Sequence, residues 1–461
     1  MNTARNLSFA ARSFAVILAS AAMSSQALAR DIDVSSGSEL SRALQTARPG
    51  DRILLREGEW TNLTFTVDRG GTPKEPITVA AKVPGQTFLT GQSAVRLAGS
   101  NIVLADLIFR DGYSPTSVVI NVRANDDLYH PRNNRITGVV IENFSKPNIN
   151  DKDNWISLTG YDHRVDHSAF IGKTNEGPTL VVRMDLDEGK PNRHRIEQNY
   201  FGYRPPFGDN GAETIRVGAS TDVDQSAQTR IYRNLFERTN GEAEAVSLKA
   251  RDIIVEENTF YEVLGALTFR HGGHNSAIRN VFFGNNLANT GGIRLTGPDH
   301  TVTGNYFEGV RGTGYLGVLA IMSGQANASS SEYRPVERAS ISGNSYFNSR
   351  RLTLAVGASS TLSVPPSDTQ VTGNLFGGNR IVEVREYAST DGISFSGNLA
   401  STEAQLAPQY AETQPMISQR AANGLYYSYI NGQRVSSGAP SDLNPVTREE
   451  VGPAYYTKPS L

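Results

Sequence analysis

The sequence predicts an all-β chain that folds as one domain, a right-handed parallel β-helix. An Asn-x-Phe pattern recurs along the chain at steps of 20-odd residues, and short apolar runs end in turns while helical periodicity is scarce. Glycine is also abundant, with 43 residues among 461. A short period built from strands is typical of a solenoid, because one coil cannot bury its apolar face alone and must stack on its neighbours.

The repeated pattern has eight copies. They begin at Asn199, Asn234, Asn258, Asn280, Asn305, Asn344, Asn374 and Asn398. The steps from Asn234 to Asn305 are 24, 22 and 25 residues, and larger steps leave room for loops. We expect Phe to stack on Phe inside and Asn to lie at a turn, because Asn tolerates left-handed backbone and can bond along the stack. Chance recurrence of a strand-ending turn in a β-sandwich is the alternative, and it explains eight copies in phase less well.

Both ends of the solenoid have their own signals. Leu40, Ala43 and Leu44 share one face of a short helix that opens at Ser38, which would cover the exposed strand edges at the end of the core. Residues 53–55 then read as the first strand. After about Ala400 the repeat stops and Pro, Ser and Gly increase. We therefore expect residues 401–461 to form an irregular C-terminal wrap of the same domain.

The first 29 residues have the features of a signal peptide. They carry Arg5 and Arg12 and no acid, then an apolar stretch over residues 13–23, and Ala27-Leu28-Ala29 as a cleavage site. The apolar stretch is too short for a permanent membrane helix. We expect a mature chain of residues 30–461 that is periplasmic or secreted. The chain has no cysteine, which excludes disulfides and a lipoprotein anchor.

The charge of the chain limits its partners. The formal net charge is −2, and removing the first 29 residues leaves about −4. Such a chain is a poor general nucleic-acid binder, so any polyanion must bind at a local basic site. We expect a monomer whose partner is neither nucleic acid nor a membrane.

Residues 240–275 are the richest in reactive side chains. Glu242 and Glu244 are two apart, so on a strand both carboxylates point the same way. Two close carboxylates repel each other unless a cation or a shared proton intervenes, and oxygen ligands suit a hard ion such as Ca²⁺. Alone, the pair would be read as a solvated charged strand.

Two cationic residues follow in the same region. Lys249 and Arg270 are 21 residues apart, about one coil, so stacked coils would place them close together on the outer surface. Either alone would be ordinary surface charge. Strict alternation from Glu244 puts Lys249 on the opposite face. We therefore expect a bulge or bend between Ala245 and Lys249.

Four motifs in this order resemble polysaccharide lyase family six, which includes alginate lyases and chondroitinase B. Asn-Gly-Glu-x-Glu-x-x-Ser-x-Lys begins at Asn240, and Leu-Thr-x-Arg-His-Gly begins one coil later at Leu267. The likeness extends upstream to residues 210–218 and downstream to residues 291–294. It covers nearly the whole mature chain, and four spaced motifs are far more specific than one.

The resemblance implies a calcium site and a pair of catalytic residues. Calcium would be held by Asn210, Glu242 and Glu244, with Asp185 or Asp187 as candidates for a further ligand. The metal neutralises the uronate carboxylate and makes the proton at C5 acidic enough to remove.

Lys249 matches the base that takes this proton. Arg270 matches the group that protonates the leaving oxygen. A guanidinium is a poor acid, so charge stabilisation with water as the proton donor stays open.

The resemblance also implies substrate contacts. Arg216, His271 and Arg294 match positions that touch substrate carboxylates and hydroxyls, and Tyr315 is a candidate for a subsite. For His271 the alternative is a structural histidine bonded to backbone. His300 we interpret as a structural turn contact.

The predicted function is a secreted lyase that cleaves an acidic polysaccharide, with alginate as the first choice, by calcium-assisted β-elimination to 4,5-unsaturated uronate ends. Dermatan sulfate is the rarer substrate of the family and the first alternative. A non-catalytic polysaccharide-binding β-helix would not need Lys249 and Arg270 beside paired glutamates. A hydrolase would need two acid groups across the bond without a cationic base. A uronate epimerase shares proton removal at C5 and is disfavoured only by the motifs.

Overall fold

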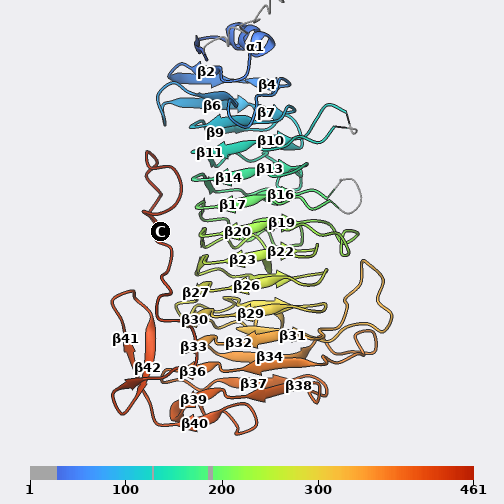
Figure 1. Cartoon of the computed structure of the whole chain (residues 1–461), viewed down its shortest axis with the longest axis vertical. Coiled ribbons are helices and arrows are strands. Elements are labelled where there is room, and N and C mark those ends of the chain that lie inside the picture. The colour runs from blue at the N-terminus through green and yellow to red at the C-terminus, as the bar shows by residue number, and fades with distance from the viewer. Residues whose placement is uncertain (1–28, 127–128, 185–189, 461) are drawn as a thin grey trace, which may run out of the picture.

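The computed structural model describes residues 29–126, 129–184 and 190–460. These residues stack into a parallel β-helix (Figure 1), as the repeat predicted. The predicted signal peptide lies outside the described residues, apart from Ala29. No helix in the described part of the chain is both long and apolar enough to cross a membrane.

Three long sheets form the faces of the β-helix, and each is named here by its strands in spatial order. Sheet 1 consists of β1 (Asp31–Val34), β2 (Arg52–Leu55), β5 (Ile77–Ala81), β8 (Ile102–Ala105), β11 (Arg135–Thr137), β14 (Arg164–Asp166), β17 (Arg195–Glu197), β20 (Arg230–Tyr232), β23 (Ile254–Glu256), β26 (Ser276–Ile278), β29 (Thr301–Thr303), β32 (Ser340–Ser342), β35 (Thr369–Thr372) and β38 (Ile393–Ser396).

Sheet 2 consists of β3 (Gly58–Thr61), β6 (Thr87–Gln92), β9 (Ile108–Tyr113), β12 (Val140–Glu142), β15 (Ala169–Ile171), β18 (Tyr200–Phe201), β21 (Leu235–Glu237), β24 (Thr259–Tyr261), β27 (Val281–Phe283), β30 (Tyr306–Glu308), β33 (Ser345–Phe347), β36 (Leu375–Gly377), β39 (Leu399–Ser401) and β40 (Glu412–Gln414).

Sheet 3 consists of β4 (Thr64–Val67), β7 (Ala94–Leu97), β10 (Val118–Val122), β13 (Asn154–Leu158), β16 (Leu180–Val182), β19 (Ile215–Val217), β22 (Glu244–Leu248), β25 (Ala266–Phe269), β28 (Ile293–Leu295), β31 (Leu319–Met322), β34 (Arg351–Val356) and β37 (Glu383–Glu386).

The repeated Asn residues form a buried ladder at the turn between sheets 1 and 2. The backbone N–H of Asn234 donates to Oδ1 of Asn258 at 2.9 Å, and that of Asn258 donates to Oδ1 of Asn280 at 3.0 Å. The left-handed residue is the one before each Asn, for example Glu257 with φ +51°, not the Asn itself. The prediction of an Asn at the turn that bonds along the stack is confirmed, but the left-handed backbone expected for the Asn is wrong, because the preceding residue adopts it.

The repeated Phe residues form one internal stack. Ring centroids lie 4.6 Å apart for Phe236 and Phe260, 4.5 Å for Phe260 and Phe282, and 4.6 Å for Phe282 and Phe307. Parallel pairing keeps equal side chains in register from coil to coil, so each ring covers the next. This stack confirms the repeat as a solenoid and fixes the backbone that carries the outer face.

The N-terminal end carries the predicted cap. Helix α1 (Gly37–Thr46) buries Leu40, Ala43 and Leu44, and Ser36 caps it by accepting the N–H of Glu39. The first strand, however, is β1 and not β2. Its alternation of acids with apolar residues, Asp-Ile-Asp-Val, hid a strand that buries mainly Val34.

The C-terminal region is more regular than predicted. Strand β40 extends sheet 2 beyond residue 401, and β41 (Ile417–Arg420), β42 (Tyr426–Ile430) and β43 (Gln433–Arg434) form a small antiparallel sheet. The last residues then run back along sheet 2 (Figure 1), where Val446 and Val451 pack against a buried cluster. Two short 3₁₀ turns, η1 (Gly314–Leu316) and η2 (Thr402–Ala404), complete the described elements.

Candidate active site on the outer face of sheet 3

The predicted site residues lie on the outer side of sheet 3, either on strands β19, β22, β25 and β28 or in the segments that flank these strands. On adjacent strands, one row of residues that are paired in register faces outward. It consists of Arg216, Ser247, Thr268 and Arg294. Each of these strands also buries apolar side chains against the core, for example Ile215, Leu248 and Phe269. Alternate side chains of the same strand therefore form the core on one side and the candidate site on the other.

A bulge brings Lys249 onto the same face as Glu244. Pairing of β22 with β25 shifts register between Glu244 and Val246, and both Ala245 and Val246 lie in the core. Glu244, Ser247 and Lys249 then face outward, and the Ser247 hydroxyl donates to Glu244 Oε2 at 2.6 Å. The predicted irregularity is confirmed, and it falls at Ala245, the start of the predicted interval.

Lys249 and Arg270 follow two paired strands. Leu248 is in register with Phe269, so each cationic residue is the first beyond its strand on adjacent coils, as the 21-residue spacing predicted. Their side chains are 17% and 19% exposed, so both are reachable from solvent. Lys249 Nζ lies 3.5 Å from Oε1 of Glu213, which also lies 3.7 Å from NH1 of Arg216.

Arg270 is held by three neighbours. Its Nε lies 3.1 Å from Glu244 Oε1, its NH1 lies 3.1 Å from Nε2 of His271, and its guanidinium carbon lies 3.9 Å from the centre of the Tyr333 ring. Burial lowers the pKa of His271 to about 4, with Arg270 and Lys249 acting in the same direction. His271 is therefore neutral and can accept the N–H of Arg270. It is also only 3% exposed, so the structure places it behind Arg270.

Glu244 is bound to cations on one oxygen and to a hydroxyl on the other. Its Oε1 pairs with Arg294 and Arg270, and its Oε2 accepts from Ser247. Burial alone would raise the pKa of Glu244, but Arg294, Ser247 and Arg270 outweigh it and hold the pKa below the ordinary value.

Glu242 has the opposite environment. Its Oε2 accepts the backbone N–H groups of Gly211 and Ala212 at 2.6 and 3.1 Å. Burial, followed by the charge of Glu213, raises the pKa of Glu242 to about 7. Glu242 and Glu213 thus form an acidic pair that a cation would stabilise.

The predicted calcium ligands are brought together only in part. Asn210 is exposed and precedes the two amides that hold Glu242, whereas Glu244 is turned toward the arginines. Within residues 29–126, 129–184 and 190–460, no three His, Asp or Glu side chains form a group that could hold a metal ion. Asp185 and Asp187 lie outside the described residues.

The donor chemistry nevertheless fits a hard cation. Buried Oε2 of Glu213 has no hydrogen-bond partner in the described part of the chain, and the carboxylate of Glu242 is destabilised by burial and by Glu213. Together with the exposed amide of Asn210 these are oxygen ligands of the kind that Ca²⁺ takes. The residues that would hold it are therefore Asn210, Glu242 and Glu213, with Glu244 available only if its arginines move.

Two side chains near the centre were missed by sequence reasoning. Glu213 lies within the motif at residues 210–218, and its place three residues before Arg216 on the same coil was a usable signal. Tyr333 comes from the long connection between β31 and β32, and nothing in the sequence tied it to Arg270. Tyr315 is 44% exposed with its ring 5.7 Å from the Arg294 guanidinium carbon, and His300 is buried with both ring nitrogens bonded to backbone, as expected.

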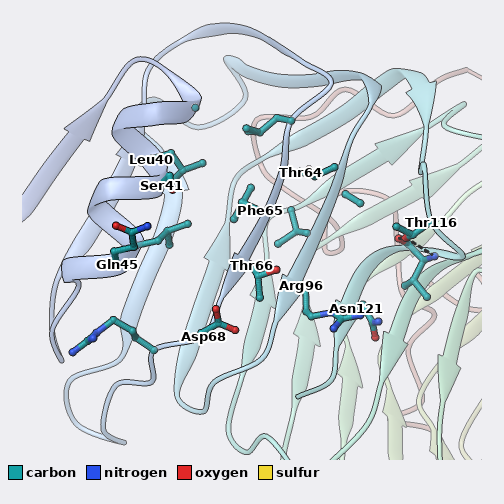
Figure 2. Close-up of a pocket in the computed structure, with 17 residues that line it drawn as sticks. Leu40, Ser41, Gln45, Thr64, Phe65, Thr66, Asp68, Arg96, Thr116 and Asn121 are labelled. Carbon is teal, nitrogen blue, oxygen red and sulfur yellow. Dashed lines mark hydrogen bonds between the residues drawn. The ribbon is translucent and has the colours of Figure 1, made fainter. Parts of the chain in front are cut away.

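A separate cavity lies at the N-terminal end of the solenoid. It measures about 720 Å³ and lies between α1 and strands β4, β7 and β10 (Figure 2). Its polar lining includes Arg96 and Asn121, which occupy the same outward row as Arg216. Between Asn121 and Arg216 the row contains Ser157 and Val181, which are both buried. The cavity is therefore separate from the site.

The fold is thus a parallel β-helix with acidic and cationic side chains on one outer face. Comparisons with known proteins identify the family of this chain. The family model described as Chondroitinase B matches residues 34–434. The chain is similar to the alginate lyase AlyGC of polysaccharide lyase family 6, with 35% identity and a TM-score of 0.90 over 94% of this chain and 60% of that one. It is also similar to a mannuronic acid specific family 6 lyase from human gut microbiota, with 27% identity and a TM-score of 0.76 over 84% and 91% of the two chains.

The chain belongs to polysaccharide lyase family 6. It spans about 60% of the length of AlyGC. No curated protein matches it.

Proposed function

We propose that this chain is a polysaccharide lyase that cleaves a uronate-containing polysaccharide, with alginate as its substrate. The observation that carries the proposal is the placement of Lys249 and Arg270 on paired strands beside Glu213, Glu242 and Glu244. Two of the similar structures are named as alginate or mannuronic acid lyases, which favours alginate. The family model's own description favours dermatan sulfate as the second candidate.

The reaction proposed is β-elimination. Lys249, in its uncharged form, takes the proton from C5 of the uronate, and the electrons of that bond form the C4–C5 double bond as the C4–O4 bond breaks. The electron pair of the broken bond goes to the departing oxygen, which gains a proton from water or from Arg270. Arg270 stabilises the negative charge that develops on this oxygen, because Glu244, His271 and Tyr333 hold its guanidinium in place.

Substrate carboxylates have cationic partners in reach. Arg216 and Arg294 are 16% and 7% exposed, and the buried Nε of each has no hydrogen-bond partner among the residues described. A calcium ion at Asn210, Glu242 and Glu213 would neutralise the uronate carboxylate and acidify the C5 proton. We also propose export to the periplasm or medium, supported by the signal-peptide features of residues 1–29.

The test uses purified protein with alginate and dermatan sulfate in parallel, with the ultraviolet absorbance of the new double bond as the readout. We expect absorbance to rise with alginate, to fall after chelation and to return when calcium is added. Chain scission without new absorbance would make the protein a hydrolase. Binding without scission of either polymer would make it a carbohydrate-binding module, and a rise only with dermatan sulfate would reassign the substrate.

A further inference from the structure

A buried guanidinium lies directly behind the acidic pair of the site. Arg204 is 3% exposed and follows β18. Its NH1 donates to the carbonyl oxygen of Glu213 at 3.0 Å and to the Thr179 hydroxyl at 3.3 Å. Its NH2 donates to the carbonyl oxygens of Asn175 and Gly177 at 3.1 and 3.0 Å. One side chain therefore fastens two coils to each other.

The partners of Arg204 are unusual for so buried a charge. Burying a guanidinium is costly, and a carboxylate normally compensates it. Here every hydrogen bond goes to a neutral oxygen, and no carboxylate of the described residues lies in ion-pair distance. Glu213, Glu242 and Asp153 act on it from farther away. Arg204 thus bonds to the backbone of Glu213, and its charge attracts the carboxylates of Glu213 and Glu242 without touching them.

The backbone around Arg204 is closely packed, so that position 241 has no room for a side chain. A Cβ on Gly241 would lie 2.2 Å from the Ala212 oxygen and 2.8 Å from Nε of Arg204. The N–H of Gly177 donates to the Gly211 oxygen at 2.6 Å, and the N–H of Phe207 donates to the Gly241 oxygen at 2.8 Å. Arg204 is therefore wedged between the segment that carries Glu242 and residues 205–213, which carry Asn210 and Glu213.

A second buried cation fixes the far side of the same contact. Nζ of Lys173 donates to Asp153 Oδ1 at 2.8 Å, to Asn175 Oδ1 at 2.6 Å and to the Asn175 and Glu176 carbonyl oxygens at 3.2 Å. The segment 175–177 is thus clamped between Lys173 and Arg204. It gives Arg204 a rigid support from which to hold Glu213.

We propose that Arg204 is a positioning residue for the cation site: its two-pronged guanidinium sets residues 211–213 against Glu242, so that the Gly211 and Ala212 amides and the Glu213 carboxylate meet Glu242 in one fixed geometry. The effect of Arg204 on calcium binding rests on the proposed function, whereas the contacts of Arg204 are those of the structure. Groups that orient metal ligands from behind typically change metal affinity by about 10- to 100-fold when they are altered.

The first arm of the test is calcium binding to the substrate-free full chain by isothermal titration calorimetry. Arg204→Lys retains the charge but cannot make both pairs of bonds, so its calcium Kd should rise about 10- to 100-fold. The matched control is Arg448→Met, which leaves the buried Glu237 on sheet 2 without its cationic partner and should lower the melting temperature with an unchanged calcium Kd. A calcium Kd unchanged in Arg204→Lys overturns the inference.

The second arm does not need calcium. Hydrogen exchange in the presence of chelator reports the amides of residues 207–214, including Gly211 and Ala212, which donate to Glu242. Arg204→Lys should lose protection there, and Arg448→Met should not. If the wild type binds no calcium, the proposed cation function fails, and the exchange data alone decide the positioning role: equal protection in wild type and Arg204→Lys refutes it.

Discussion

The Asn ladder and the outer face of sheet 3 are built on the same coils, yet they follow opposite rules. In the ladder each Asn is 0–2% exposed and each Oδ1 from Asn258 to Asn398 accepts from the coil before it. On the outer face, Glu213 Oε2 and the Nε atoms of Arg216 and Arg294 are buried without a hydrogen-bond partner in the described structure. The side-chain amides of the ladder are paired from coil to coil, whereas the site contains buried polar atoms that have no partner among the described residues.

The difference is also visible in the backbone. The ladder keeps strict register through eight coils, while the site depends on a shift at Ala245. Identical coils cannot create a unique constellation, so the chemistry requires a local departure from the repeat. The regular ladder stabilises the coils on which the bulge at Ala245 lies.

The largest effect is expected from breaking the aromatic stack beside the ladder. Phe260 lies between Phe236 and Phe282 and is 3% exposed. Phe260→Ala should lower the free energy of unfolding by about 3–5 kcal/mol, because it leaves a cavity in a packed column. Denaturant unfolding measures this loss. The rate of the proposed reaction in the folded protein should be unchanged, and a lost rate at retained stability would mean that the stack belongs to the site.

A second effect concerns pH at another corner of the coils. His300 accepts the N–H of Asn275 at Nδ1, its Nε2 lies 2.8 Å from the Thr296 oxygen, and burial lowers its pKa to about 4. The unfolded chain takes up the proton near pH 6.5, so the stabilisation is complete above that pH and is lost as pH falls toward 4. It amounts to on the order of 3 kcal/mol.

His300→Asn is the matched control, because Asn275 accepts the N–H of Ile253 at the same corner one coil earlier. Unfolding free energies at pH 7 and pH 4.5 should fall farther in the wild type than in His300→Asn. An equal fall in both proteins would show that this histidine does not couple folding to pH.

The smallest of these effects tests the contacts of Arg270. Arg270→Lys keeps the charge but loses the planar group that meets Glu244, His271 and Tyr333. We expect kcat to fall about 10²-fold, about 2.7 kcal/mol in activation free energy, with little change in melting temperature. A fall of only a few-fold would mean that charge alone suffices at this position.

The sequence was a good guide wherever one residue type repeats. The Asn and Phe positions predicted the coil and the inner stack, and the spacing of Leu40, Ala43 and Leu44 predicted the capping helix, because period and burial can be read from the chain alone. The spacing of Lys249 and Arg270 predicted their pairing for the same reason, and parity predicted the bulge. Strand β1 and the sheet β41–β43 were missed, because they have no copy to compare with.

The contacts of the site were less predictable than its residues. Glu242 and Glu244 were expected to act as one pair, but Gly211 and Ala212 hold one and Arg294 and Arg270 hold the other. Tyr333 reaches the site from a distant part of the chain, and the bonds of Arg204 to residues 175 and 177 join segments on different coils, so only folding reveals these contacts. Spacing within a strand tells which face a side chain takes, but not which partner it finds.

The most direct test of the account measures Lys249→Ala for both chemistry and stability. With alginate as substrate, formation of the C4–C5 double bond should fall about 10²–10⁴-fold, because a positioned base is lost. The protein should stay folded with only a small fall in melting temperature, because Lys249 packs little against the core and Arg216 remains 3.7 Å from the buried Glu213 when the lysine is removed. Lys82→Ala, which removes an exposed lysine from a surface ion pair, should change neither quantity. A Lys249→Ala protein that forms the double bond at the wild-type rate would contradict the account.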